Sequence, residues 1–111
     1  MKINTQDYNN VTVVELHGEF TTDFVEPFRD TADKLINSGK KGIVLDMNGT
    51  TFVDSIGLEQ LLWLRDYCYE KKCQLKLANL GEDCSTILRI TQLENKFDRY
   101  NELAEAVKSF T

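Results

Sequence analysis

The 111-residue sequence has few cysteines, one histidine and no histidine cluster, and these shortages exclude several kinds of site. Its three cysteines are an odd number without a C-x-x-C pair, which is typical of neither a disulfide framework nor a zinc site. We therefore expect Cys68, Cys73 and Cys84 to be reduced, packed thiols. His17 has no Cys or His partner nearby in the sequence, so we predict no metal site and no cofactor.

Long hydrophobic runs are also missing. No window approaches the roughly 20 apolar residues of a membrane-spanning helix, and no secretory leader follows Lys2. We therefore expect a cytoplasmic protein without a membrane span. Thirteen basic residues against eighteen acidic ones give a net charge of -5 and a pI near 4.8. Because such a chain repels phosphate backbones, we expect no direct binding of nucleic acid.

The motifs of common enzyme classes are absent as well. No G-x-S-x-G elbow presents a serine as a nucleophile, and the only histidine belongs to a different predicted strand from the serine of interest, Ser55. The sequence also lacks a glycine-rich P-loop and a dinucleotide-binding fingerprint. We therefore predict that the protein is not an enzyme and has no catalytic residue.

The patterns that are present predict one α/β domain over residues 1–111. Val14 and Leu16 alternate with polar residues and should face the core, whereas the continuous apolar run at 42–47 is typical of a central strand. The predicted strands are residues 2–8, 11–18, 41–47 and 73–79, with a short extra strand around Phe97; the predicted helices lie within 21–39, 55–72, 82–93 and 101–110.

This order, ββαβαβα with a short extra strand before the last helix, predicts a mixed, mainly parallel sheet in an α/β sandwich. The helices should be amphipathic and pack on the sheet. Thr22 or Asp23 is expected to cap the first helix. Trp63 and Leu64 are candidates for an exposed contact patch, although apolar residues at helical spacing are more often part of a core.

The stretch "TFVDSIGLEQLLWL" begins a helix with residues that are poor helix formers. Asp54 or Ser55 suits the N-cap, where a side-chain oxygen accepts a free backbone N–H and contributes about 1 kcal/mol. Gly57 costs roughly 0.5–1 kcal/mol relative to alanine in the first turn, so something must require its small size. A helix N-terminus also favours a phosphorylated oxygen, and Asp54 and Glu59 would repel it, which suits a switchable surface.

At these residues the sequence resembles the STAS domain family, named for sulphate transporters and anti-sigma factor antagonists. The resemblance runs through "VVELHGEF", "GIVLDM", "FVDSIGLEQLL" and "ILRITQLENKF", and so covers nearly the whole chain. Its most specific part is the D-S-x-G-L of residues 54–58 between an apolar strand and an amphipathic helix.

The resemblance implies an anti-sigma factor antagonist, a protein-binding regulator of transcription. In such proteins the serine at the position of Ser55 is phosphorylated by a partner that is both an anti-sigma factor and a serine kinase. Phosphorylation weakens the complex, and a serine phosphatase restores it. Asp54 would help to recognise Ser55, Gly57 and Leu58 would let the partner approach, and Ile56 and Asp23 would also lie at the contact.

The sequence departs from the family pattern at three places. Ile56 replaces a smaller residue, residues 18–21 read Gly-Glu-Phe-Thr where the family often has Gly-Glu-Leu-Asp, and Gln92 replaces a glycine. Ile56 either changes partner choice or marks a domain that does not use phosphorylation. The alternative function is therefore a binding subunit of a signalling assembly, or a cytosolic accessory of a membrane transporter, that is not phosphorylated.

Overall fold

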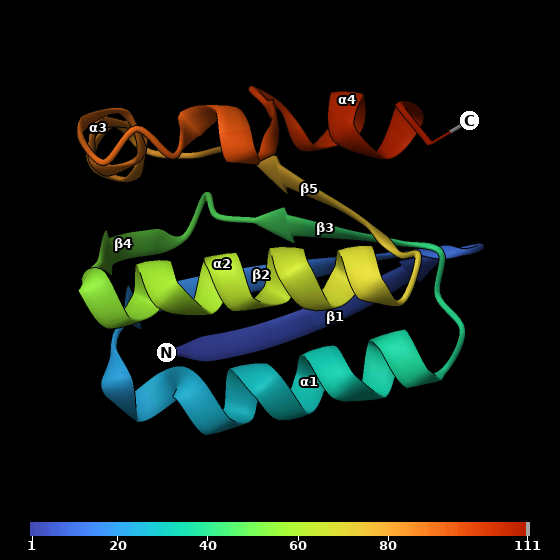
Figure 1. Ribbon diagram of the computed structural model, residues 1–111. Helices are drawn as coiled ribbons and strands as arrows, with labels where there is room; N and C mark the ends of the chain where they lie inside the picture. The colour runs from blue at the N-terminus through green and yellow to red at the C-terminus, as the bar shows by residue number, and fades with distance from the viewer. Residues whose placement is uncertain (111) are drawn as a thin grey trace.

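The sheet is assembled on strand β2, which pairs with β1 along one edge and with β3 and then β4 along the other. In the computed structural model, which describes residues 1–110, the antiparallel β1 occupies one edge of β2, and the parallel β3 and β4 occupy the other (Figure 1). The sheet continues from β3 to the parallel strands β5 and β6. The strands are β1 (Lys2–Tyr8), β2 (Val11–Phe20), β3 (Gly42–Asp46), β4 (Thr50–Val53), β5 (Gln74–Ala78) and β6 (Asp98–Tyr100).

This architecture confirms the predicted mixed, mainly parallel sheet, and β6 is the short extra strand expected before the last helix. The predicted order was wrong at residues 50–53, which form β4 and not a loop, so the order is ββαββαβαβα. β4 is only four residues long and pairs with β2 beyond an irregularity between Gly18 and Glu19. So short a segment becomes a strand because it pairs with a neighbouring strand, and the local sequence pattern does not reveal that pairing.

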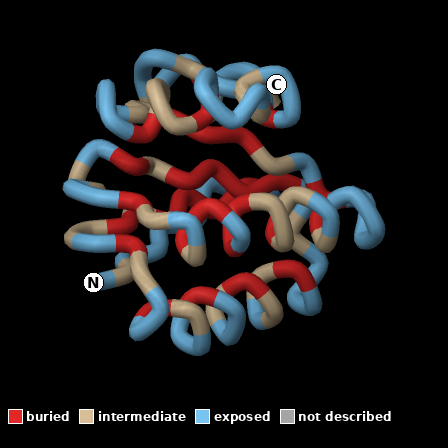
Figure 2. The backbone as a smooth tube through the Cα atoms, turned by 60° about the vertical axis from the view of Figure 1, so that its left-hand side comes forward, coloured by how far each residue is buried: buried red, intermediate tan, exposed pale blue. Residues whose placement is uncertain are grey.

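The helices cover both faces of the sheet. Helices α1 and α2 lie side by side on one face, and α4 lies across β3 from α2, on the other face (Figure 1). Figure 2 shows buried backbone running through the strands, with the outer sides of the helices exposed. The helices are α1 (Val25–Asn37), α2 (Ser55–Glu70), α3 (Glu82–Ile90) and α4 (Leu103–Lys108), with short 3-10 turns η1 (Thr22–Phe24) and η2 (Glu94–Lys96).

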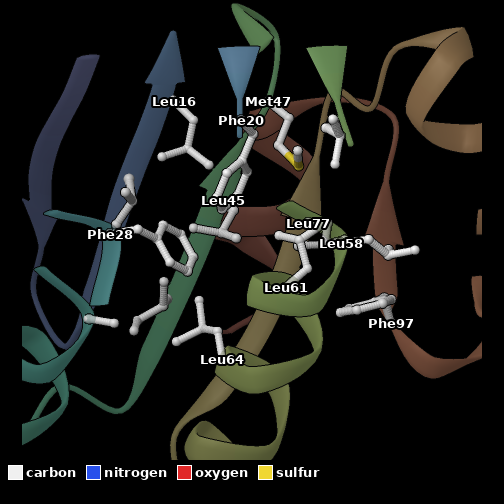
Figure 3. Close-up of a cluster of buried hydrophobic side chains, with 14 of the residues drawn as sticks. Leu16, Phe20, Phe28, Leu45, Met47, Leu58, Leu61, Leu64, Leu77 and Phe97 are labelled. Carbon is white, nitrogen blue, oxygen red and sulfur yellow. The ribbon is translucent and has the colours of Figure 1, made fainter. Parts of the chain in front are cut away.

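The core has a large and a small part, one on each face of the sheet. Val14 and Leu16 face the large part, as predicted. Val11 and Val13, on the opposite face of β2, are buried too, because Ala106 of α4 packs there. Figure 3 shows the large part, where leucines and phenylalanines of the strands meet those of α1 and α2: Leu16, Phe20, Phe28, Leu45, Leu58, Leu61, Leu64 and Leu77.

The start of α1 differs from the expected cap. Thr22 and Asp23 do not cap this helix; both lie in η1, and the N-cap position of α1 is Phe24 without a side-chain hydrogen bond. Phe24 is buried with its ring centroid 5.6 Å from that of Phe20, edge to face. The burial of this ring, and not a polar cap, fixes how the chain enters α1.

Two helices end in the same left-handed turn without a glycine. Gln92 after α3 has a φ of 60° and donates its N–H to the carbonyl of Arg89, while the next N–H reaches Leu88. This is the arrangement in which glycine is the most common residue. The helix-ending turn therefore forms although Gln92 stands where the family has a glycine, and Lys72 forms the same turn after α2 with a φ of 59°.

The suggested patch of Trp63 and Leu64 is wrong for Leu64, which is only 1% exposed and packs in the core. Trp63 is half-buried at the side of α2, edge to face with Phe28 at 6.5 Å and beneath the Arg29 guanidinium at 4.6 Å. Gln60, one turn earlier, accepts a 2.7 Å hydrogen bond from Arg29. These contacts join α2 to α1, so this side of the helix is internal packing.

Because the core is filled at Leu64, we predict that Leu64→Ala lowers the free energy of unfolding by about 2–5 kcal/mol. Tyr69→Ala is the matched control, since Tyr69 lies on the same helix and is 86% exposed. It should change stability by less than about 0.5 kcal/mol. Urea unfolding followed by circular dichroism measures both; equal effects of the two variants would contradict the packing described.

Candidate functional site

The first turn of α2 is held by Asp54, which is its N-cap. The Asp54 side chain accepts the Gly57 N–H at 2.8 Å, and its carbonyl accepts the Leu58 N–H at 2.9 Å. The Asp54 N–H points to the Phe20 carbonyl at 3.4 Å. Of the two residues suited to the cap, the structure thus assigns the role to Asp54, and the Ser55 side chain is not used for it.

Ser55 is the first residue of α2 and is exposed to solvent. Within residues 1–110, its hydroxyl makes no hydrogen bond to another protein group. The hydroxyl stands at the positive end of a 16-residue helix, where a negative group is favoured. A modifying enzyme could therefore reach this oxygen without breaking any contact of the fold.

Gly57 is buried and is required by a close backbone approach. A Cβ built at this position would lie 2.4 Å from the Phe20 carbonyl oxygen and 3.0 Å from a methyl carbon of Val53. Real Cβ atoms do not come this near a backbone oxygen. The structure therefore answers why the helix accepts a glycine in its first turn: the helix is seated against the end of β2.

The other predicted partner-binding residues divide into exposed and internal ones. Asp23 is exposed in η1, three residues after Phe20, and Ile56 is half-buried beside Ser55. Leu58 is 9% exposed and belongs to the core. The structure thus brings Asp54, Ser55 and Ile56 to one surface near the η1 loop. Gly57 and Leu58 lie beneath it, where Gly57 packs against Phe20 and Leu58 packs in the core.

Phe52, which the sequence analysis did not select, is 47% exposed on β4 just before this helix. The available signal was the run Thr-Thr-Phe-Val, whose residue types favour strands, but residues 50–53 were not recognised as a strand. Thr51, Phe52, Gly81 and Asp83 border a cavity of about 70 Å³ between β4 and α3. Small-molecule sites are usually several times larger, so the site is a surface.

The chain segments that form this surface carry acidic but no basic side chains. The carboxyl end of β2, the start of α2 and the start of α3 lie toward the same end of the molecule as β4 (Figure 1). Residues 18–26, 46–60 and 78–86 carry eight of the eighteen acidic residues and none of the thirteen lysines and arginines. Such a surface is electrostatically complementary to a positively charged one.

The described part of the chain shows no candidate metal cluster and no candidate membrane-spanning helix. Between residues 1 and 110, no group of three or more His, Cys, Asp or Glu side chains is placed to hold a metal ion. None of the helices in this range combines the length and hydrophobicity needed to cross a bilayer. The arrangement at the start of α2 is thus an exposed hydroxyl on an acidic surface.

Comparison with known proteins shows the family of the chain. The STAS domain family model matches residues 2–106. A STAS-domain containing protein of Pseudomonas aeruginosa is 30% identical over 84 residues, covering 76% of this chain and 82% of that protein.

Three solved structures are similar in fold. An anti-sigma factor antagonist from Mycobacterium paratuberculosis has a TM-score of 0.86 and 18% identity, over 97% of this chain and 92% of that one. The Bacillus cell fate determinant SpoIIAA in its phosphorylated form has a TM-score of 0.77 and 18% identity, over 99% and 100%. A sulfate transporter family protein from Wolinella succinogenes has a TM-score of 0.82 and 16% identity, over 92% and 85%. At these identities the likeness establishes a shared fold.

The tight seat of Gly57 predicts that Gly57→Ala destabilises the protein, although alanine is the better helix former by about 1 kcal/mol. Overpacking against the Phe20 carbonyl should outweigh this gain and leave a net loss of about 1 kcal/mol or more. Glu59→Ala, at an exposed position two residues later, is the control and should be near neutral. A Gly57→Ala variant more stable than the parent in urea unfolding would refute this account.

Proposed function

Since the chain belongs to the STAS domain family, we propose that it is an anti-sigma factor antagonist whose binding is switched off by phosphorylation of Ser55. Its partner would be an anti-sigma factor that is also a serine kinase, and a serine phosphatase would reverse the modification in the cytoplasm. The protein would act by binding and not as an enzyme. One observation carries the proposal: the Ser55 hydroxyl is exposed and makes no hydrogen bond within the described residues, in a helix turn that the Asp54 cap and the buried Gly57 hold in place.

The acidic surface supports the switch. Phosphorylation adds a charge of about -1.5 to -2. The free N–H groups of α2 would accept it locally, but it would join a surface whose nearby charges, including Asp54 and Glu59, are already negative. A basic partner surface shaped around a small hydroxyl would then meet an added bulky group. A tenfold loss of affinity needs only about 1.4 kcal/mol.

The proposed contacts follow from the placement of the residues. Asp54, Ile56 and Asp23 would touch the partner directly, with Asp54 also presenting Ser55 to the kinase. Gly57 and Leu58 would allow the approach by keeping the helix end close against β2 and the core. Ile56 would add an apolar contact beside the modified oxygen and so influence which kinase is accepted.

The alternative is a STAS binding subunit that is not phosphorylated, either in a signalling assembly or as an accessory of a membrane transporter. The likeness in fold to a sulfate transporter family protein favours keeping this candidate. In that case Ser55 would be a contact residue only. Mass spectrometry of the protein from its native cells separates the two, because the first proposal requires a phosphorylated Ser55 in some growth condition.

Because the switch depends on charge at one position, we expect Ser55→Ala to retain affinity for the anti-sigma factor and Ser55→Asp to lose about tenfold, roughly 1.4 kcal/mol. Ser38→Asp is the matched control: it adds the same charge at an exposed residue after the end of α1. Calorimetry with the purified anti-sigma factor measures the affinities. Equal affinity of the parent, Ser55→Asp and the phosphorylated protein would exclude the switch.

The two roles of Asp54 can be separated because asparagine caps a helix about as well as aspartate. We predict that Asp54→Asn keeps the stability within about 0.5 kcal/mol, whereas Asp54→Ala loses about 1 kcal/mol with the cap. Asp54→Asn should nevertheless slow phosphorylation of Ser55 by the kinase, measured as phosphate incorporated over time. An unchanged rate would limit Asp54 to its structural role.

A further inference from the structure

At the opposite end of α2 from Ser55, two cysteines take the paired positions of the helix-ending turn. Lys72 donates its N–H to the Tyr69 carbonyl at 3.3 Å, and Cys73 donates its N–H to the Cys68 carbonyl at 2.8 Å. This pair of bonds defines a turn in which the residues at the positions of Cys68 and Cys73 commonly touch. Both thiols are free and buried, as the sequence predicted.

The backbone bond alone brings the two cysteines within disulfide range. A carbonyl oxygen lies about 2.4 Å from its own Cα, and an amide nitrogen about 1.5 Å from its own Cα. With 2.8 Å between oxygen and nitrogen, the two Cα atoms are therefore at most roughly 6.7 Å apart. Disulfides usually join Cα atoms 4.4–6.8 Å apart. Oxidation would thus require little movement of the backbone.

The pair also borders a route from solvent. Cys68 and Cys73 both line an open hollow of about 580 Å³ beside β5, together with Arg65, Tyr69 and Lys76. Cys84, by contrast, lies on α3, and burial raises its pKa to about 11. The chain therefore holds a thiol pair next to an open hollow and one thiol without a cysteine partner, which provides an internal comparison.

We propose that Cys68 and Cys73 are a redox modification site, at which hydrogen peroxide converts the two thiols into an intramolecular disulfide. The Cys73 sulfur attacks one peroxide oxygen, the O–O bond breaks, and the leaving hydroxide takes the thiol proton as water. The resulting sulfenic acid is attacked by the Cys68 sulfur, which loses its proton as the S–O bond breaks and a second water leaves. The two thiols are oxidised, and one peroxide is reduced to two waters.

The order of the two steps follows from the opposite pKa shifts of the two neighbouring thiols. The neighbouring Cys68 side chain lowers the pKa of Cys73. The neighbouring Cys73 side chain, and then burial, raise the pKa of Cys68. Since a thiolate is the nucleophile toward peroxide, Cys73 reacts first and Cys68 closes the bond.

The experiment treats the purified, fully reduced protein with hydrogen peroxide, alkylates the remaining thiols under denaturing conditions and digests the product with trypsin. Lys71 and Lys72 lie between the two cysteines, so cleavage separates the Cys68 peptide, residues 66–71, from the Cys73 peptide, residues 73–76. We expect these two peptides to be joined until a thiol reductant is added, and Cys84 to be alkylated. The pair should react about tenfold faster than Cys84 or more.

Two variants sharpen the test. Cys84→Ser should leave the joined peptides unchanged. Cys68→Ser removes the resolving thiol, so Cys73 should instead accumulate as a sulfenic acid that dimedone traps. Circular dichroism before oxidation checks that both variants are folded. The proposal is overturned if Cys68 and Cys73 remain alkylatable, if Cys84 reacts as fast as the pair, or if peroxide joins two chains and not two peptides of one chain.

Discussion

The contact on which the site depends is the close approach of Gly57 to the carbonyl of Phe20. It seats the first turn of α2 against the end of β2, and the same Phe20 carbonyl faces the Asp54 N–H. The Phe20 ring, in turn, packs against Phe24 and Phe28, which fix η1 and α1. One residue at the end of one strand therefore positions both the helix that carries Ser55 and the loop that carries Asp23.

The three parts of helix α2 make different contacts. Its first turn presents Ser55 and Ile56 above the buried Gly57, its middle packs Leu61 and Leu64 in the core, and its end places Cys68 against Cys73. A rigid middle is what allows both ends to hold side chains in defined positions. In the proposed function, the exposed end would lose affinity through added charge and would not need any change in the fold.

The acidic surface explains why phosphorylation would weaken binding in the proposed switch. Because residues 18–26, 46–60 and 78–86 contain no lysine or arginine, these segments would offer a phosphate on Ser55 attraction through the helix end. That attraction is local and makes the modified state structurally acceptable. In the proposed function, a docking protein with a positively charged, closely packed surface would meet the added phosphate as a change in both charge and shape.

The sequence by itself determined the main strands, the amphipathic helices, the α/β class and the start of a helix at residues 54–55, because period-2 and period-3.6 patterns and capping chemistry act between neighbouring residues. Tertiary structure decided the rest. It made residues 50–53 a strand by pairing them with β2, buried Leu64 while leaving Trp63 at the side of the helix, and replaced the expected cap of α1 by the burial of Phe24. It also supplied the reason for Gly57, since the atom that excludes a side chain there belongs to Phe20, 37 positions earlier in the chain. Contacts over such separations depend on how whole elements pack, and no local pattern specifies them.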